Sequence, residues 1–163
     1  MMARLVGGLD RCVAALLAGG SWLLLPVVAL LFLQWPLRDL VHAWSREAND
    51  LGQWIFALYV AIAFTAATRA HTHLAADALA QRYPARTRAL IAQLGALLGL
   101  APFALFVSIG GVHLVVPALR LRETFPDTGN PGYFLIKLAL WLLALLILAQ
   151  VVIDLARPRR SAP

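Results

Sequence analysis

Apolar residues are collected into four long runs along this chain, and the short segments between the runs carry most of the charges. The runs are residues 12–37, 51–68, 89–119 and 132–153. Only the last run contains a charged side chain, Lys137. A helix that crosses a hydrocarbon core of about 30 Å needs about 20 apolar residues, a length that each run approaches or exceeds. We therefore expect four transmembrane helices. Their predicted spans are about residues 13–37, 51–69, 89–116 and 132–154.

The runs predict helices and not the strands of a membrane barrel. Continuous Leu, Ala and Val lack the alternation of a barrel strand, and hydrocarbon tolerates no unpaired backbone. No linker long enough to separate domains is present, so we expect one all-α integral membrane domain over residues 1–163.

Pro26 and Pro102 lie inside spans, where each removes a backbone hydrogen bond and predicts a kink. Gly95 and Gly99 form a Gly-x-x-x-Gly pair that lets another helix approach closely, although such pairs also arise by chance in Ala/Gly-rich spans.

Composition points to the same class of protein. The chain is 61% hydrophobic and 13% charged, with a mean hydropathy of +0.78, which lies outside the range of soluble globular domains. The first run exceeds the apolar region of about 7–15 residues in a secretory signal, so we expect a retained helix. Cys12 is the only cysteine, which excludes an intramolecular disulfide. The net charge of +6 is not gathered on one basic face, so nucleic-acid binding is not expected.

The basic residues beside the helix ends predict the orientation of the chain. Four spans place both termini and the loop between spans 2 and 3 on one side of the membrane. Nine arginines fall on that side and four on the other, with Lys137 set aside. Because cytoplasmic loops carry the excess of Arg and Lys, we expect both termini in the cytoplasm. Aromatic residues then gather near the outer interface, where amphipathic rings are expected: Trp35, Trp44, Trp54 and Tyr133.

The loop between spans 2 and 3 predicts a short amphipathic helix over residues 69–84, ended by Pro84. Arg69, His73 and Asp77 follow one another at positions i, i+4 and i+8, so a helix places them on one side, while apolar residues form another stripe. We expect this helix to lie along the cytoplasmic membrane surface, with Arg69, His73 and Asp77 in one hydrogen-bonded cluster.

Few residues in the chain could carry chemistry. His71 and His73 point to different sides of a helix and no further ligands complete a shell, so we expect no metal site.

His113 is the only histidine within an apolar run. Because the other histidines lie in loops, a second haem ligand at matching depth is missing, and a polar contact between helices is the expected role of His113. A four-helix haem anchor of a redox enzyme remains an alternative. For Lys137 we expect snorkelling to the outer interface, with ion coupling as the alternative.

Catalysis is not expected, because the chain has no Gly-x-Ser-x-Gly, His-Glu-x-x-His or Walker motif. No cofactor is expected either. A carrier that works alone usually places ionisable groups or broken helices at the membrane midplane in two related halves, and apart from Lys137 the runs hold no charged side chain. A stand-alone small carrier therefore remains only an alternative. The favoured class is a membrane-embedded partner of another protein.

The loop after span 2 resembles the signature of the small membrane subunit, the DctQ type, of tripartite ATP-independent periplasmic (TRAP) transporters. That family has a basic residue near the end of helix 2, then His, then Asp four residues later, then Leu- or Tyr-Pro and more arginines. The matching positions are Arg69, His73, Asp77, Tyr83, Pro84, Arg86 and Arg88. Residues 48–54, residues 130–137 and Gln150 are similar to further stretches of the family.

The resemblance implies a complex of three proteins in the bacterial inner membrane. A periplasmic receptor captures an organic acid, the large membrane subunit moves it inward by sodium symport, and the small permease subunit binds the large one. No substrate or sodium ligand is expected in the small subunit. A cytoplasmic contact with the large subunit or lipid is expected at Arg69, His73, Asp77, Arg86 and Arg88. Acids of the outer loops are expected to face the receptor by electrostatic complementarity: Glu47, Asp50, Glu123 and Asp127.

Overall fold

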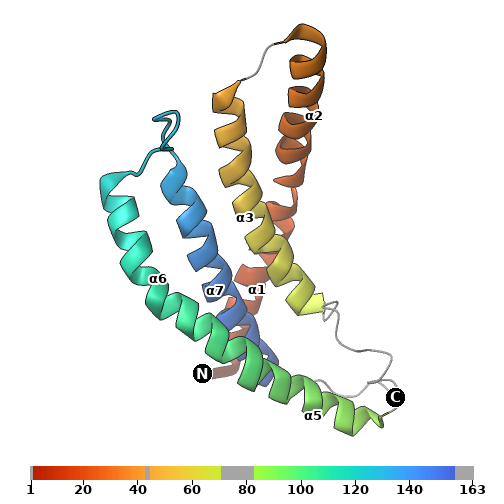
Figure 1. Cartoon of the computed structure of the whole chain (residues 1–163). Helices are drawn as coiled ribbons and strands as arrows, with labels where there is room; N and C mark the ends of the chain where they lie inside the picture. The colour runs from red at the N-terminus through yellow and green to blue at the C-terminus, as the bar shows by residue number, and fades with distance from the viewer. Residues whose placement is uncertain (1, 43–44, 71–82, 157–163) are drawn as a thin grey trace.

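The computed structural model describes residues 2–42, 45–70 and 83–156, and every regular element in these residues is helical (Figure 1). The elements are α1 (Met2–Ser21), α2 (Leu24–Val41), α3 (Arg46–Ala70), α5 (Ala85–Gly95), η1 (Ala96–Leu100), α6 (Ala101–Leu121) and α7 (Tyr133–Ala156). A single antiparallel bridge joins Thr124 to Pro131 in the loop before α7. The predicted all-α fold is therefore confirmed. The predicted surface helix, with His71, His73 and Asp77, lies outside the described residues, as does Trp44.

Four helical stretches are long and apolar enough to cross a membrane, as the sequence predicted. They are Arg4–Val41, Arg46–Ala70, Arg86–Leu121 and Tyr133–Ala156. The first and third are 38 and 36 residues long, well beyond the roughly 20 residues that a straight crossing needs. Both contain an interruption of the regular α-helix. Each also begins closer to the N-terminus than the predicted spans 13–37 and 89–116.

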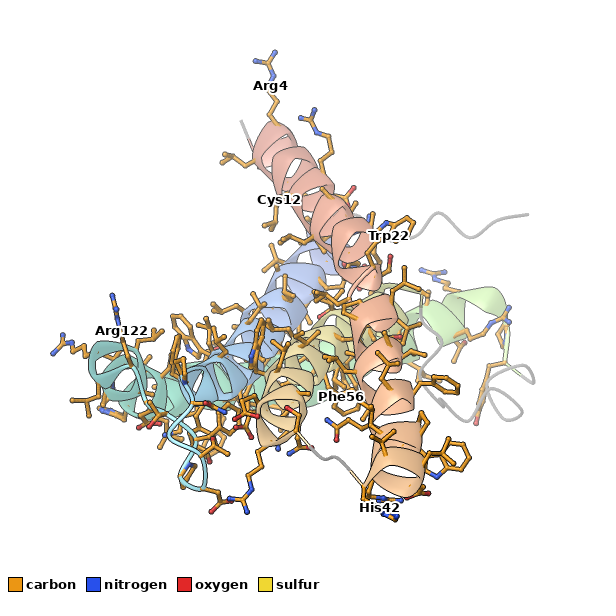
Figure 2. The ribbon with its side chains drawn as sticks, turned by 90° about the horizontal axis from the view of Figure 1, so that it is seen from above. Arg4, Cys12, Trp22, His42, Phe56 and Arg122 are labelled. Carbon is orange, nitrogen blue, oxygen red and sulfur yellow. The ribbon has the colours of Figure 1, made fainter. Side chains whose placement is uncertain are left out.

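The first interruption separates α1 from α2 and lies one turn before Pro26. A proline ring clashes with the carbonyl four residues back, which here belongs to Trp22. That carbonyl accepts a hydrogen bond from the backbone N–H of Leu25 instead, at 3.2 Å, and a tight turn replaces the helix there. In Figure 2, α1 runs from Trp22 to Arg4 in one direction, while α2 runs toward His42 in another. The kink predicted from Pro26 is thus present.

The second interruption is the π-helical segment η1, directly before Pro102. The backbone N–H of Ala101 bonds to the carbonyl of Ala96, five residues back, so the helix takes up one extra residue. This widened turn accommodates a proline whose ring would otherwise meet the carbonyl of Leu98. As a result α5 turns aside from α6 and lies across the lower end of the helices in Figure 1.

Helix α7 is the centre of the packing. It contacts α1, α3 and α6, whereas α2 packs mainly against α3. In the apolar window of α7, 39% of the residues are buried, against 6% in the first and third spanning stretches. The core between α6 and α7 is built from Ala104, Ile147 and Val151. Most of the outer surface of α2 and α6 is left to lipid or to another protein.

Helix α1 crosses α3 at Gly20, which is buried. A Cβ atom added at Gly20 would lie 2.8 Å from Cγ2 of Ile62 and closer still to its Cδ1 atom. The neighbouring Gly19 is exposed, and a Cβ atom there would meet nothing within 4 Å. The close approach of α1 to α3 therefore depends on the missing side chain of Gly20.

We expect Gly20→Leu to lower the free energy of unfolding by about 1–3 kcal/mol, the usual cost of overpacking a well-filled contact. Thermal unfolding of the purified protein in detergent micelles measures the change. Gly19→Leu is the matched control, because it brings the same gain in helix propensity without a clash. Equal melting temperatures for the two variants would show that α1 does not pack on α3 at Gly20.

Candidate functional site

A polar cluster joins α1, α3 and α7. Arg69 Nη2 lies 2.6 Å from Oδ1 of Asp10, and Arg69 Nη1 donates a hydrogen bond to Gln150 Oε1 at 3.4 Å. Gln150 Nε2 in turn donates to Oδ1 of Asp154 at 2.9 Å. We call these four residues the inner cluster. They bring together three helices that are far apart in the sequence.

The inner cluster satisfies a side chain that would be costly to bury alone. Gln150 is only 2% exposed, yet both ends of its amide are used, since the oxygen accepts from Arg69 and the nitrogen donates to Asp154. The side chains of Arg69 and Asp10 are 31% and 21% exposed, so their ion pair is partly shielded from water. Arg69 thus pairs with the Asp10 carboxylate and is linked to Asp154 through the Gln150 amide, an arrangement that holds three helices together.

Arg69 has two partners that the sequence did not indicate. Arg69 was expected to cluster with His73 and Asp77, which lie outside the described residues, and that expectation stays a prediction. Within the described chain Arg69 contacts Asp10 and Gln150. Sequence reasoning missed Asp10, although it is the only acid ahead of the first apolar run. Helical periodicity could not have found this pair, because its members lie on different helices.

At the opposite end of the bundle, Asp50 fastens the loop between α6 and α7 to the first turns of α3. The carboxylate is 7% exposed and accepts hydrogen bonds from Thr128 Oγ1 at 2.5 Å and from Asn130 Nδ2 at 3.0 Å. The loop turns back at Gly132, whose φ of +122° strongly favours glycine. A Cβ atom at Gly132 would lie 3.2 Å from Cδ1 of Trp54 on α3. The loop is therefore packed against α3 as well as hydrogen-bonded to it.

A second contact ties the same loop to α7. Lys137 Nζ lies 2.5 Å from Glu123 Oε2 and 5.6 Å from the centre of the Tyr133 ring. The Tyr133 ring also meets Phe125, which is buried, edge to face with centroids 5.5 Å apart. The ammonium of Lys137 thus reaches from the helix to the loop, as expected for a snorkelling lysine. Its charge is balanced there by a carboxylate.

The four acids that were expected to face a receptor fall into two groups. Asp50 and Glu123 are engaged inside the loop contacts just described. Glu47 and Asp127 are exposed, with Glu47 accepting a hydrogen bond from Ser45 Oγ at 3.0 Å. If any of these acids meets a partner directly, the exposed pair is better placed to do so. Receptor contact itself stays a prediction.

Other predicted residues lie apart from both clusters. Arg86 and Arg88 are exposed at the start of α5. Gly95 and Gly99 are exposed too, and a Cβ atom added at either would meet nothing within 4 Å. No helix of the described chain therefore packs closely against this glycine pair. A packing role for it requires a partner and stays a prediction.

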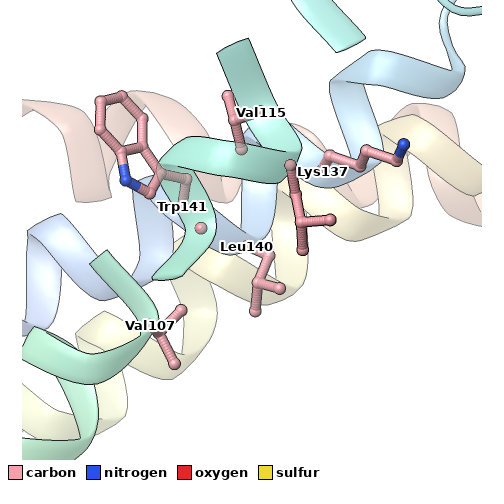
Figure 3. A pocket seen from close by; sticks show the side chains of 7 residues that line it. Val107, Val115, Lys137, Leu140 and Trp141 are labelled. Atoms are coloured by element: carbon pink, nitrogen blue, oxygen red, sulfur yellow. The ribbon is translucent and has the colours of Figure 1, made fainter. Parts of the chain in front are cut away.

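A shallow groove lies between α6 and α7 (Figure 3). It is lined by Val107, Gly111, Leu114, Val115, Lys137, Leu140 and Trp141. Figure 3 shows the amine of Lys137 directed away from the groove, and the other lining residues are apolar except for the Trp141 indole N–H. That N–H is already used, because it donates to the carbonyl of Ser108 at 2.9 Å. Such a surface suits an apolar side chain or lipid and not an organic anion.

The described residues include no group of three or more His, Cys, Asp or Glu side chains that could hold a metal ion. His42 and His113, the two histidines within the described ranges, are on different helical stretches, at the end of α2 and within α6. The polar groups that the structure brings together thus hold helices to one another and hold the loop between α6 and α7 to its neighbouring helices. These contacts stabilise the arrangement of the helices.

Comparison with protein families agrees with the resemblance noted in the sequence. The model of the family described as tripartite ATP-independent periplasmic transporters, DctQ component, matches residues 27–161. The match runs from α2 through α7 and so covers most of the chain. It names a transporter component and not an enzyme. No curated protein and no solved structure matches the chain.

We expect Asp50→Ala to release the loop between α6 and α7. The variant leaves Thr128 and Asn130 without their shared acceptor, which should cost about 1.5–3 kcal/mol, as for hydrogen bonds to a charged group. Trypsin should then cut faster after the exposed Arg122, with the melting temperature lowered. Asp127→Ala, which removes an exposed acid from the same loop, is the control. Identical cleavage rates in the two variants would contradict the assignment.

A double-mutant cycle tests the inner cluster. Because Asp10 and Arg69 are in direct contact and partly shielded, we expect Asp10→Asn and Arg69→Gln to be coupled by about 1–3 kcal/mol in thermal or chemical unfolding. The matched control is the exposed pair Arg38 and Asp39, 2.8 Å apart with side chains 65% and 43% exposed. Its coupling should stay within about 0.5 kcal/mol of zero. Equal coupling energies in both cycles would mean that the Asp10–Arg69 pair adds no more stability than an exposed ion pair.

Proposed function

We propose that this chain, which belongs to the DctQ component family of tripartite ATP-independent periplasmic transporters, is the small permease subunit of such a transporter in a bacterial inner membrane. Its family and its four apolar helices make it a multi-pass membrane protein. In this proposal it binds the large membrane subunit. The large subunit moves an organic acid inward by sodium symport, and a periplasmic receptor delivers that acid.

The placement of the polar groups is the observation that supports a structural role for this chain beside the large subunit. Within the described residues, the inner cluster and the loop contacts of Asp50 and Lys137 place charged side chains at opposite ends of the bundle. Between α6 and α7, the Trp141 indole N–H donates to the Ser108 carbonyl, a contact without charge. A carrier that binds ions or anionic substrate places such groups near the midplane, at broken helices. Here Arg69 and Lys137 each pair with a carboxylate, and Asp50 accepts two hydrogen bonds from the loop. These contacts hold the helices and the loop in place, which suits a rigid support for another protein.

The arginine distribution supports an orientation with both termini and the inner cluster on the cytoplasmic side. There, α5 turns across the end of the bundle and exposes Arg86 and Arg88 (Figure 1). Anionic headgroups attract exposed arginines at this surface, and so would acidic residues of the large subunit. In the proposed complex Arg86 and Arg88 make this contact together with Arg69, His73 and Asp77.

On the periplasmic side, the proposal gives the loops a docking role for the receptor. Asp50 and Glu123 act indirectly, by holding the loop in one shape. The exposed carboxylates of Glu47 and Asp127 offer charge to a basic patch on the receptor. Exposed charges of this kind steer association and set specificity more than they raise affinity.

Reconstitution tests the proposal. Proteoliposomes that hold this chain and the large subunit from the same gene cluster should take up a radiolabelled organic acid when the receptor and an inward sodium gradient are supplied. The chain alone should move none of a panel of dicarboxylates, keto acids and sugar acids, because it lacks a site at depth. Uptake by the chain alone, or failure of the two membrane proteins to co-purify, would contradict the proposal. A Soret band in the purified chain would favour the haem-anchor alternative.

A further inference from the structure

Among the polar side chains within the apolar spans, His113 is one that neither set of contacts uses. His113 lies in the interior of α6 and is exposed on the outside of the bundle. The side of α6 that packs against α7 holds Ala104, Val115 and Ala118, all buried. His113 is two residues from Val115, and a helix turns by about 200° over two residues, so its side chain leaves the opposite side.

The position of His113 is costly if lipid covers it. It lies seven residues before Arg120, which puts it about 10 Å along the helix from that end, at about 1.5 Å rise per residue. A histidine side chain is too short to carry its ring over this distance to the interface, as a lysine stem can. Among the described residues no hydrogen bond reaches its imidazole. A polar group exposed to hydrocarbon without a partner is strongly disfavoured, so the surface around it calls for a protein neighbour.

The surroundings of His113 have the shape for such a neighbour. Phe106 and Ile109 are 77% and 69% exposed, and Gly110 and Pro117 are exposed beside them. These five residues recur every three or four positions, so they form one stripe, which we call the α6 outer face. A Cβ atom at Gly110 would meet nothing within 4 Å, which leaves a notch where another helix can come close.

The α6 outer face continues into the apolar groove between α6 and α7. Leu114, which lines the groove, follows Gly110 by four residues and so adjoins it on the helix surface. The exposed side of α2 differs, since its large side chains Leu25, Val28 and Phe32 are all apolar. Lipid solvates that side without cost. Of these two exposed surfaces, only the α6 outer face carries a hydrogen-bonding group at depth.

We infer that the α6 outer face is the surface on which the large membrane subunit docks, and that a transmembrane helix of that subunit presents a hydrogen-bonding side chain to His113. This inference rests on the proposed function, because it takes the large subunit as the neighbour. A helix from the partner seats against Gly110 between the side chains of Phe106 and His113. An apolar side chain of the same partner can enter the groove beside Leu114.

Co-purification of the large subunit with the tagged, full-length chain from detergent-solubilised membranes tests the inference. Gly110→Trp fills the notch and should reduce recovery of the large subunit by at least about tenfold, equivalent to about 1.4 kcal/mol. His113→Leu should reduce it severalfold, and His113→Gln, which can still hydrogen-bond, should restore most of it. Ala29→Trp, on the exposed side of α2, is the matched control and should leave recovery unchanged.

The outcomes separate the inference from the function on which it rests. The three substituted positions, Gly110, His113 and Ala29, are all exposed, so none of the four variants should lower the melting temperature of the chain alone. If the wild-type chain retains no large subunit, the proposed function fails. If the wild type retains it and both Gly110→Trp and His113→Leu do so equally well, the function stands and the docking face is wrong. A dimer of this chain that Gly110→Trp abolishes would also overturn the inference, because the face would then bind a second copy.

Discussion

A lipid bilayer offers no hydrogen-bond partner to a polypeptide backbone, and most of this structure follows from that constraint. Four apolar runs become helices because helices satisfy their own backbone groups. Pro26 and Pro102 interrupt the regular helix locally, and in each case the change appears in the residues just before the proline. Near Pro26 the chain forms a tight turn, and near Pro102 it widens into a π-helical segment. At the first site the Trp22 carbonyl accepts from the backbone N–H of Leu25, and at the second the N–H of Ala101 reaches the carbonyl of Ala96.

The same constraint explains where the polar side chains are found. In hydrocarbon a charge needs a partner at contact distance or a route to water. Arg69 meets Asp10 and Gln150 toward one end, and Lys137 meets Glu123 at the other. These contacts set which helices are neighbours, a choice that nonspecific apolar packing leaves open because lipid tails are as apolar as leucine. His113 is the exception that points outward, and for that reason it is the most informative residue about a partner.

Some of this could be predicted from the sequence. The number of spans, the fold class, the family and the two bends followed from run length, composition, a spaced motif and the positions of prolines. The side-chain partners did not follow. Asp10 and Arg69 lie in different spans, and Asp50 meets Thr128 and Asn130 across an interval that no local periodicity describes. Hydropathy also could not reveal that α7 is central, because the largely exposed first and third spanning stretches are nearly as apolar as α7, and burial inside a membrane protein depends on neighbours.

The central place of α7 has a consequence for how the molecule is made. Helices enter the membrane in the order of synthesis, N-terminal ones first, and associate once they are inserted. Helices α1, α2 and α3 contact one another and can meet early. Helix α6 packs mainly against α7, and Gln150 and Asp154 also arrive with α7. A ribosome that stops before residue 133 would therefore release three spans whose principal partner is missing, in which Arg69 still has Asp10 but lacks Gln150.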